Sequence, residues 1–335
     1  MEPVTLLTIG VVFVGFAFWL MYPGSGIIAK MGRRKQNREK ENLENALKFI
    51  YKCEYEKKNC SLNGLAGNLK ISADMVTGTL ETLSEMKLIE YHGDHFSLTQ
   101  EGRSYALRII RIHRIWEKYL SERTSVHEKD WHYKAEEQEH IMSISEADAL
   151  AEKLGNPIYD PHGDPIPQKD GSLPPAKSHS LNTLKAGDFG RVTHIEDEPQ
   201  VIYEQILAQD IRPGMQLRVL SSENNKVTVE AEGDEKVFSN AFAANINVKH
   251  LHKSEVSEEH FKTLATLKPG DKAVIAGISK KVFGLNRRRL LDLGFVPGTE
   301  ISCLMKSPSG EPTAYIVKGA TIALRDDQVK TIFIR

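Results

Sequence analysis

The sequence predicts an α+β protein in which an N-terminal transmembrane helix precedes a winged helix-turn-helix, a helical metal-binding domain and two tandem small β-barrels. Three observations predict this architecture: an uncharged apolar run at residues 4–22, histidines and glutamates at helical spacing between positions 113 and 140, and an internal repeat that begins at Leu184. The chain has 335 residues, 40% of them hydrophobic and 27% charged, which is enough for several folded domains.

The apolar run "VTLLTIGVVFVGFAFWLMY" opens the chain and carries no charge. At about 1.5 Å per residue it spans roughly 28 Å as a helix, close to the hydrocarbon thickness of a bilayer. A cleaved signal peptide is the alternative, but such signals begin with basic residues, and only Met1, Glu2 and Pro3 precede this run. A basic stretch follows at 30–40, so the positive-inside rule predicts a single-pass protein of the cytoplasmic membrane whose C-terminal body lies in the cytoplasm.

Charge and cysteine content narrow the class of partner. The formal net charge is −1, so any contact with nucleic acid must depend on a local basic surface. The three cysteines provide neither a disulfide framework nor a C-x-x-C pair, which agrees with a reducing compartment.

Residues 41–106 have the element order of a winged helix-turn-helix. Apolar spacing predicts helices at 41–56, 61–69 and from 73 onward, and "LIEYHGDHFSLTQEG" predicts a hairpin about a Gly-Asp turn. Ser72 is the predicted N-cap of the third helix, which would read DNA. The candidate DNA contacts are Lys70, Ser72, Met75, Thr77 and Thr79. Because this helix carries Asp74 and no basic residue before Lys87, a weak reader or a purely structural three-helix domain is the alternative.

The segment "HYKAEEQEHIM" places His132, Glu136, Glu139 and His140 at i, i+4, i+7 and i+8, within about a 100° arc of one helix. A long helix before it carries His113 and Glu117 at i, i+4. Imidazoles and carboxylates without thiolate suit Mn²⁺ or Fe²⁺ and tolerate Zn²⁺ or Co²⁺. The alternative to a metal site is that these histidines and glutamates form the solvent-exposed face of an amphipathic helix.

Enzyme signatures are missing from the sequence. It contains no H-E-x-x-H, no glycine-rich phosphate loop and no G-x-S-x-G, so we predict that the chain is not an enzyme. A dimetal hydrolase is the remaining enzymatic alternative, and it would need an open metal position and a nearby base.

A proline-rich linker and a repeat complete the chain. The linker "NPIYDPHGDPIPQKDGSLPP" holds six of the fourteen prolines. Beyond it, "LKAGDFGRV" at Leu184 returns as "LKPGDKAVI" at Leu267, and "ILAQDIRPGMQLRVL" returns as "LLDLGFVPGTEISCL", so that Pro213 corresponds to Pro297. Short β-runs with glycine at the corners predict two similar small barrels.

These motifs carry a family resemblance. "IHRIWEKYL", "WHYKAEEQEHIMS" and "DPHGDPIP", behind a winged helix ending in "LTQEG", resemble the diphtheria toxin repressor family of metal-dependent transcription regulators over residues 41–255. The last barrel, with "RRRLLDLGFVPGTEI", resembles the FeoA-like domain of ferrous iron transport. The resemblance implies a homodimer on double-stranded operator DNA, in which metal fixes the first helix against the metal-binding helices.

The resemblance also implies two adjacent metal sites. His113, Glu117 and His132 match the ancillary set, and Glu136, Glu139 and His140 match the primary set. Where the family offers a ligand on its leading helix, this chain has Asn45, a weaker ligand, with Glu44 beside it as a substitute. Glu136 replaces the cysteine of iron-sensing members, which favours Mn²⁺. The first barrel offers His194, Glu196 and Asp197 as unranked ancillary ligands against the alternative of an exposed acidic loop. His162 in the linker is interpreted as a turn residue, with a metal ligand as the alternative.

The predicted domain boundaries follow from these patterns. They are a transmembrane anchor at 1–29, a basic juxtamembrane linker at 30–40, a winged helix at 41–106, a metal-binding and dimerisation domain at 107–156, a proline-rich linker at 157–180, and FeoA-like barrels at 181–255 and 262–335. We predict a membrane-anchored, Mn²⁺- or Fe²⁺-dependent repressor of metal-uptake genes. The alternative is a metal-sensing accessory of a membrane iron or manganese transporter with little DNA binding.

Overall fold

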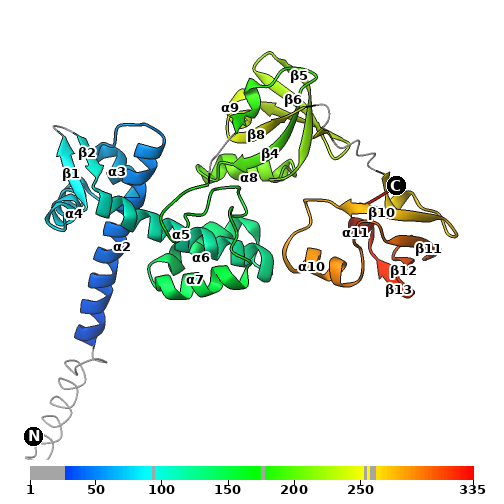
Figure 1. Ribbon diagram of the computed structural model, residues 1–335, viewed down its shortest axis with the longest axis horizontal. Helices are drawn as coiled ribbons and strands as arrows, with labels where there is room; N and C mark the ends of the chain where they lie inside the picture. Colours follow the sequence, from blue (N-terminus) through cyan, green and yellow to red (C-terminus); the bar gives the residue numbers. More distant parts are fainter. Residues whose placement is uncertain (1–26, 93–94, 175–177, 253–254, 257–261) are drawn as a thin grey trace, which may run out of the picture. The chain divides into compact units, whose positions relative to one another are not determined.

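The computed structural model describes residues 27–335 except 93–94, 175–177, 253–254 and 257–261 (Figure 1). It divides into two compact units. Of the described residues, the first unit holds those up to Arg111 together with Glu139–Met142, and the second holds Ile112–Gln138 and Ser143–Arg335.

The first unit is a winged helix built on one long helix. Its elements are α2 (Ile27–Tyr55), α3 (Leu62–Leu69), α4 (Ala73–Glu85), strands β1 (Ile89–His92) and β2 (His95–Leu98), and the first half of α5 (Gln100–Arg123). The two strands pair antiparallel, as the hairpin pattern predicts. Apolar side chains from all three helices are buried together, among them Leu47, Leu65 and Leu83. The predicted helix-helix-helix-hairpin order is therefore present.

The predicted location in the cytoplasmic membrane, with the membrane as a partner, is corrected. Within the described part of the chain, no helix is long and apolar enough to cross a bilayer. The long helices α2 and α5 have 29 and 24 residues, but charged side chains are distributed along both. The predicted span, residues 4–22, lies outside the described residues. The stretch 30–40, predicted as a basic juxtamembrane linker, is helical, because α2 runs through it without a break.

The second unit begins with three helices and a strap. After the second half of α5 come a short 3₁₀ turn (Glu128–Asp130), α6 (Trp131–Glu139) and α7 (Ile144–Lys153). Ser143 closes a capping box with Glu146 at the start of α7. The residues from 157 to 168 contain no helix or strand beyond a single bridge between Tyr159 and Pro165. We call them the strap.

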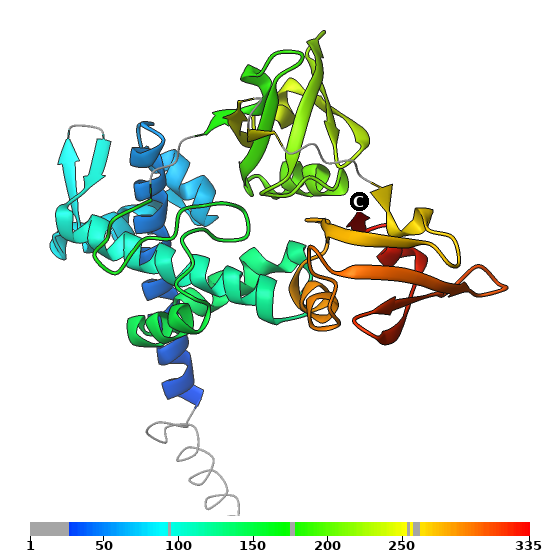
Figure 2. The ribbon, with the colours of Figure 1, turned by 45° about the vertical axis from the view of Figure 1, so that its right-hand side comes forward.

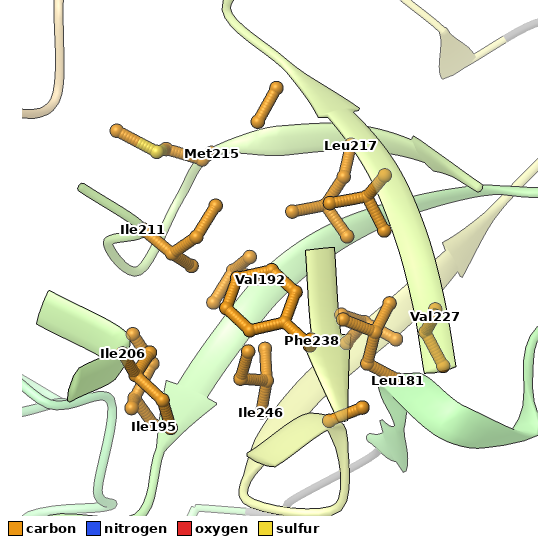
Figure 3. Packing of buried hydrophobic residues seen from close by; sticks show 14 of the residues in the cluster. Leu181, Val192, Ile195, Ile206, Ile211, Met215, Leu217, Val227, Phe238 and Ile246 are labelled. Atoms are coloured by element: carbon orange, nitrogen blue, oxygen red, sulfur yellow. The ribbon is translucent and has the colours of Figure 1, made fainter. Parts of the chain in front are cut away.

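The first barrel is a six-stranded sheet of order β3-β8-β4-β5-β6-β7. Its elements are β3 (His179–Ser180), β4 (Phe189–Ile195), α8 (Gln200–Ala208), β5 (Gln216–Glu223), β6 (Lys226–Ala231), β7 (Asp234–Ser239), α9 (Asn240–Ala243) and β8 (Ile246–Leu251). Aliphatic side chains and the Phe238 ring fill its interior (Figure 3). A register shift between Val192 and His194 bends β4 against β8.

The second barrel repeats this topology, in the order β13-β12-β11-β10-β14-β9. Its elements are β9 (Lys262–Thr263), β10 (Lys272–Ile278), α10 (Gly284–Asp292), β11 (Glu300–Lys306), β12 (Thr313–Val317), β13 (Ala320–Leu324), α11 (Asp326–Val329) and β14 (Ile332–Ile334) (Figure 2). The register of β10 against β14 shifts between Ile275 and Gly277, at the position that corresponds to the register shift in β4. The predicted α+β fold with two tandem barrels is confirmed.

Candidate metal centre

Five donor side chains from four segments of the second unit meet around Glu117. His113 and Glu117 lie on α5, His132 is the second residue of α6, His162 lies in the strap, and Asp197 lies in the loop after β4. Their donor atoms form two triplets in which all atoms lie within 4.8 Å of one another: His113, Glu117, His132, and Glu117, His162, Asp197. We call these five residues the Glu117 cluster. Both triplets share Glu117.

The distances within the Glu117 cluster are those of donors that face one point. Glu117 Oε1 lies 3.2 Å from His113 Nε2, 3.5 Å from His132 Nδ1 and 3.6 Å from His162 Nε2. Asp197 Oδ2 lies 3.2 Å from His132 Nδ1. Glu117 Oε1, His132 Nδ1 and His162 Nε2 are buried and have no well-oriented hydrogen-bond partner. Because buried polar atoms are rarely left in this state, their convergence fits a divalent cation.

The strap is folded so that His162 points inward. One carboxylate oxygen of Asp160 accepts the backbone N–H groups of His162, Gly163 and Asp164, each at 2.9 Å. Gly163 has φ +97°, and a Cβ there would lie 1.9 Å from the Thr193 carbonyl oxygen, so only glycine allows the strap to approach β4 this closely. The Arg114 guanidinium clamps the same turn, donating to the Pro165 carbonyl at 2.7 Å and lying 3.1 Å from Asp164.

A second layer of contacts sets the tautomer of His162. Tyr203 donates its hydroxyl hydrogen to Glu128 at 3.2 Å, so its oxygen accepts a hydrogen bond from His162 Nδ1 at 2.8 Å. Metal-binding histidines are commonly held through their second ring nitrogen in this manner. His162 Nε2 is thereby the atom directed at Glu117, and it can act as a ligand once it loses its proton.

Without metal, protons occupy the Glu117 cluster. Burial disfavours the charged form of Glu117, but the neighbouring His113 and His162 outweigh it and hold the pKa of this carboxyl well below its usual range. Burial likewise disfavours charge on His162, yet the carboxylate of Glu117 raises the pKa of this imidazole to about 10. Contacts with Asp197 and Glu117 overcome burial at His132 and raise its pKa to about 12. The imidazolium protons therefore compete with a cation.

This competition predicts the pH dependence of metal binding. We expect the Mn²⁺ affinity of the full chain to rise between pH 6.5 and 8.5, by about tenfold per unit for each proton displaced. In the metal-free chain the raised pKa of His162 stabilises the fold fully below about pH 6.5, and this contribution is lost as the pH rises toward 10. Calorimetry in buffers of different ionisation heat counts the released protons. His162→Gln should release one fewer, and an affinity independent of pH would contradict the assignment.

The first unit holds a second acidic group, formed by Glu44, Lys48, Glu139 and His140. Glu44 Oε2 lies 2.5 Å from His140 Nδ1, and its other oxygen accepts a hydrogen bond from Tyr105 at 2.7 Å. Lys48 Nζ donates to both oxygens of Glu139, at 2.7 and 2.8 Å, and His140 Nε2 lies 3.4 Å from Glu139. We call this set the His140 group. Its imidazole bridges two carboxylates, and the Lys48 ammonium occupies both oxygens of Glu139.

Burial of Glu44 opposes its charge, but the hydrogen bonds from His140 and Tyr105 prevail, so the pKa of this carboxyl is lowered. The Glu44 carboxylate is therefore charged and paired at neutral pH. For metal to bind between Glu139 and His140, Lys48 must leave the Glu139 carboxylate.

Comparison with known proteins agrees with this chemistry. Residues 99–168 match the family model described as iron dependent repressor, metal binding and dimerisation domain, and residues 179–250 and 262–335 match the FeoA domain. The iron-dependent repressor IdeR of Mycobacterium leprae is 27% identical over 211 residues, which cover 59% of this chain and 91% of that protein. A solved manganese-dependent transcriptional repressor in complex with manganese superposes with a TM-score of 0.56 at 27% identity, covering 62% of this chain and all of the other.

The chain is homologous to the diphtheria toxin repressor family. The resemblance seen in the sequence is thus confirmed, and the family comprises metal-dependent transcriptional repressors rather than enzymes. A different relative is a probable metal transport system membrane protein of Chlamydia trachomatis, 33% identical over 87 residues. The match covers 26% of this chain and only 19% of that protein.

Set against the family pattern, the ancillary residues His113, Glu117 and His132 lie together, and of the three first-barrel candidates only Asp197 joins them. His194 is engaged elsewhere, 3.4 Å from Asp164 and 2.9 Å from the Asn247 amide. Glu196 belongs to neither triplet among the described residues.

The residues expected in the primary site are divided. Glu139 and His140 lie in the first unit with Glu44, whereas Glu136 belongs to the second unit, where its carboxylate lies 3.5 Å from His132 Nε2. On α2 it is Glu44, not the half-buried Asn45, that contacts His140.

Two residues of these groups differ from the sequence-based expectation: His162, for which a metal ligand ranks below a turn residue, and Lys48, which is not considered there. His162 does occupy a turn, as expected, but its side chain is only 2% exposed and enters the Glu117 cluster, which favours the alternative that it can reach a metal. The signal that would have found it is Asp160 two positions earlier and Gly163 one later, a pairing typical of a tight turn that aims the residue between them. Lys48 had no signal, since its partner Glu139 is 91 residues away.

The proposed reading helix α4 presents its N-terminal half to solvent. Ser72 caps it by accepting the Met75 N–H at 3.3 Å, as predicted. Thr77 and Thr79 donate to carbonyls of their own helix, at 3.0 and 2.8 Å. Met75 is 49% exposed. Lys70 is the C-cap of α3, has a left-handed backbone conformation and lies in the turn before α4. This surface offers few cations for phosphate.

Proposed function

We propose that the chain is a metal-dependent DNA-binding regulator, a repressor of metal-uptake genes that acts as a homodimer and responds to Mn²⁺ or Fe²⁺. The observation that carries this proposal is the set of three buried atoms without well-oriented partners, Glu117 Oε1, His132 Nδ1 and His162 Nε2, in the Glu117 cluster. The donors are nitrogen and oxygen only, which suits Mn²⁺ and Fe²⁺ and also accommodates Zn²⁺ or Co²⁺. The family models and the repressors to which the chain is similar support the same role.

The Glu117 cluster and the His140 group have different roles in the proposed response to metal. A bound cation would supply positive charge that replaces the imidazolium protons. Glu117, His132 and Asp197 join α5, α6 and the first barrel around one point, and His162 adds the strap. In the His140 group, Glu44 joins α2 to the residue that follows α6, so occupation there biases the position of the helix that leads into the winged helix. Metal binding then favours one arrangement of the reading helices over others.

DNA recognition is assigned to the exposed start of α4. Ser72, Met75, Thr77 and Thr79 would face a groove, and Lys70 would contact phosphate. Because one protomer offers so few basic residues here, affinity depends on two copies. Few phosphates are neutralised, so the affinity should fall only weakly as the salt concentration rises.

Selection from a random duplex pool at physiological salt tests this function. With Mn²⁺ we expect enrichment of a two-fold symmetric sequence, and with chelator none. Met75→Ala should weaken binding to the selected duplex by about tenfold, corresponding to the loss of one base contact. Glu85→Ala, an exposed change at the far end of the same helix, serves as its control. Equal enrichment with and without metal would contradict metal dependence.

One observation favours a second function. The stretch shared with a probable metal transport system membrane protein suggests a metal-sensing accessory of an iron or manganese transporter in which α4 no longer reads DNA. Asp74 in the first turn and the shortage of cations on α4 agree with this alternative. It predicts Mn²⁺ binding without enrichment of any duplex, so the same selection separates the two functions.

A further inference from the structure

The second barrel contacts the metal-binding helices through one loop. This loop, residues 279–283, joins β10 to α10 and ends in Phe283, and Gly284 begins α10. The Phe283 ring meets the Trp131 indole edge to face, with centroids 5.4 Å apart and planes at 82°. Trp131 is only 2% exposed and directly precedes His132 at the start of α6. Its indole also lies 6.1 Å, centroid to centroid, from the His162 ring.

The loop has further attachments that fix its position. Gly284, with φ +57°, packs so closely on the end of α5 that a Cβ would lie 3.1 Å from the Ser121 carbonyl oxygen. On the other side, Ser279 donates to Glu232 of the first barrel at 2.6 Å, and the backbone N–H of Lys280 donates to the same carboxylate at 3.2 Å.

The internal repeat gives this loop a counterpart. In the first barrel, the loop between β4 and α8 occupies the same place in the topology and supplies Asp197 to the Glu117 cluster. The second barrel therefore uses the equivalent loop to contact Trp131. This residue is next to His132 in the sequence, and its ring lies near the ring of His162.

We propose that the second barrel positions the metal ligands, with Phe283 holding Trp131 and thereby the orientation of His132 and His162. The Phe283 side chain carries no ligand atom, so Phe283 is a positioning residue rather than a ligand. A contact of this kind controls affinity because ligands that are already oriented lose little freedom on binding. The inference rests on the proposed metal binding at the Glu117 cluster.

Calorimetric titration of the full chain with MnCl₂ tests the proposal. We expect Phe283→Ala to weaken Mn²⁺ binding at the Glu117 cluster by about tenfold, the lower end of the effect of supporting contacts around metal ligands. Phe283→Tyr keeps the ring and should bind within about twofold of the unaltered chain. Leu285→Ala removes a 43% exposed side chain two residues further on, in α10, and should leave Mn²⁺ binding unchanged.

The possible outcomes distinguish a failure of the proposed metal binding from a failure of the positioning role of Phe283. If the unaltered chain binds no Mn²⁺, the proposed function itself fails. If it binds and Phe283→Ala binds equally well, or Phe283→Tyr is as weak as Phe283→Ala, the positioning role is overturned. Should circular dichroism show that Phe283→Ala does not fold, Glu232→Ala decides, because it loosens the loop without touching the aromatic contact. Reduced Mn²⁺ affinity of that variant supports the role, and unchanged affinity refutes it.

Discussion

Replacing Lys48 by methionine is expected to lower the free energy of unfolding of the metal-free chain by about 3 kcal/mol, the cost of breaking a buried ion pair on one side. Glu139 is the buried partner, with its side chain fully enclosed, and Lys48 is 21% exposed. Methionine preserves the length of the stem but leaves the carboxylate without its ammonium. Urea unfolding in the presence of chelator measures the loss.

The same substitution should strengthen Mn²⁺ binding at the His140 group, because a cation no longer displaces an ammonium before reaching Glu139. We expect added Mn²⁺ to restore most of the lost stability of Lys48→Met, since a ligand of the folded state stabilises by mass action. Lys35→Met is the matched control on α2: its ion pair with Glu39 is solvent-exposed on both sides, so its loss should cost less than about 0.5 kcal/mol. A Lys48→Met chain as stable as the unaltered one in chelator would refute the assigned role of Lys48.

Glu117→Gln is expected to weaken Mn²⁺ binding at the Glu117 cluster by about 100-fold, with loss of metal-dependent DNA binding. Glutamine keeps the shape of the side chain but removes the one negative charge shared by both triplets, and removing one member of a buried charge pair costs about 3 kcal/mol or more. The pKa of His162 should fall at the same time, because the Glu117 carboxylate is what raises it against burial.

Calorimetry measures the affinity, and NMR titration of the His162 ring measures the pKa shift. Glu122→Gln is the control, since this residue lies on the same helix α5, with its side chain 42% exposed beside Lys118. If Glu117→Gln bound Mn²⁺ as tightly as Glu122→Gln, the ion would not lie in the Glu117 cluster.

Local spacing predicted those parts of the site that lie on single helices. His113 and Glu117 share a face of α5 because they are four residues apart, and the same spacing relates His132 to Glu136 on α6. The barrels were predictable for a similar reason, since their repeat is written in the chain at Leu184 and Leu267.

Tertiary contacts decided the rest. Asp197 faces the cluster from the loop after β4, whereas His194, still on the strand, contacts Asp164 and Asn247. No pattern in "HIEDEPQ" reveals which of these side chains reaches the cluster. His162 enters the cluster because Arg114 clamps the strap from α5. On α2, the helical phase placed Glu44 on the face of Lys40 and Lys48, four residues to either side, and turned Asn45 away by about 100°.

The predicted membrane anchor shows a different limit. Hydropathy of residues 4–22 predicted a span, but in the described part of the chain the long helices are charged along their length, and no helix there could cross a bilayer.

The central claim is that the Glu117 cluster captures a divalent cation, and anomalous diffraction from crystals grown with MnCl₂ tests it most directly. Data collected on either side of the manganese absorption edge should show a peak about 2.0–2.3 Å from Glu117 Oε1 and from at least two of His113, His132, His162 and Asp197, typical distances for nitrogen and oxygen ligands. A well-ordered Glu117 cluster with no anomalous peak among its donors would contradict the account.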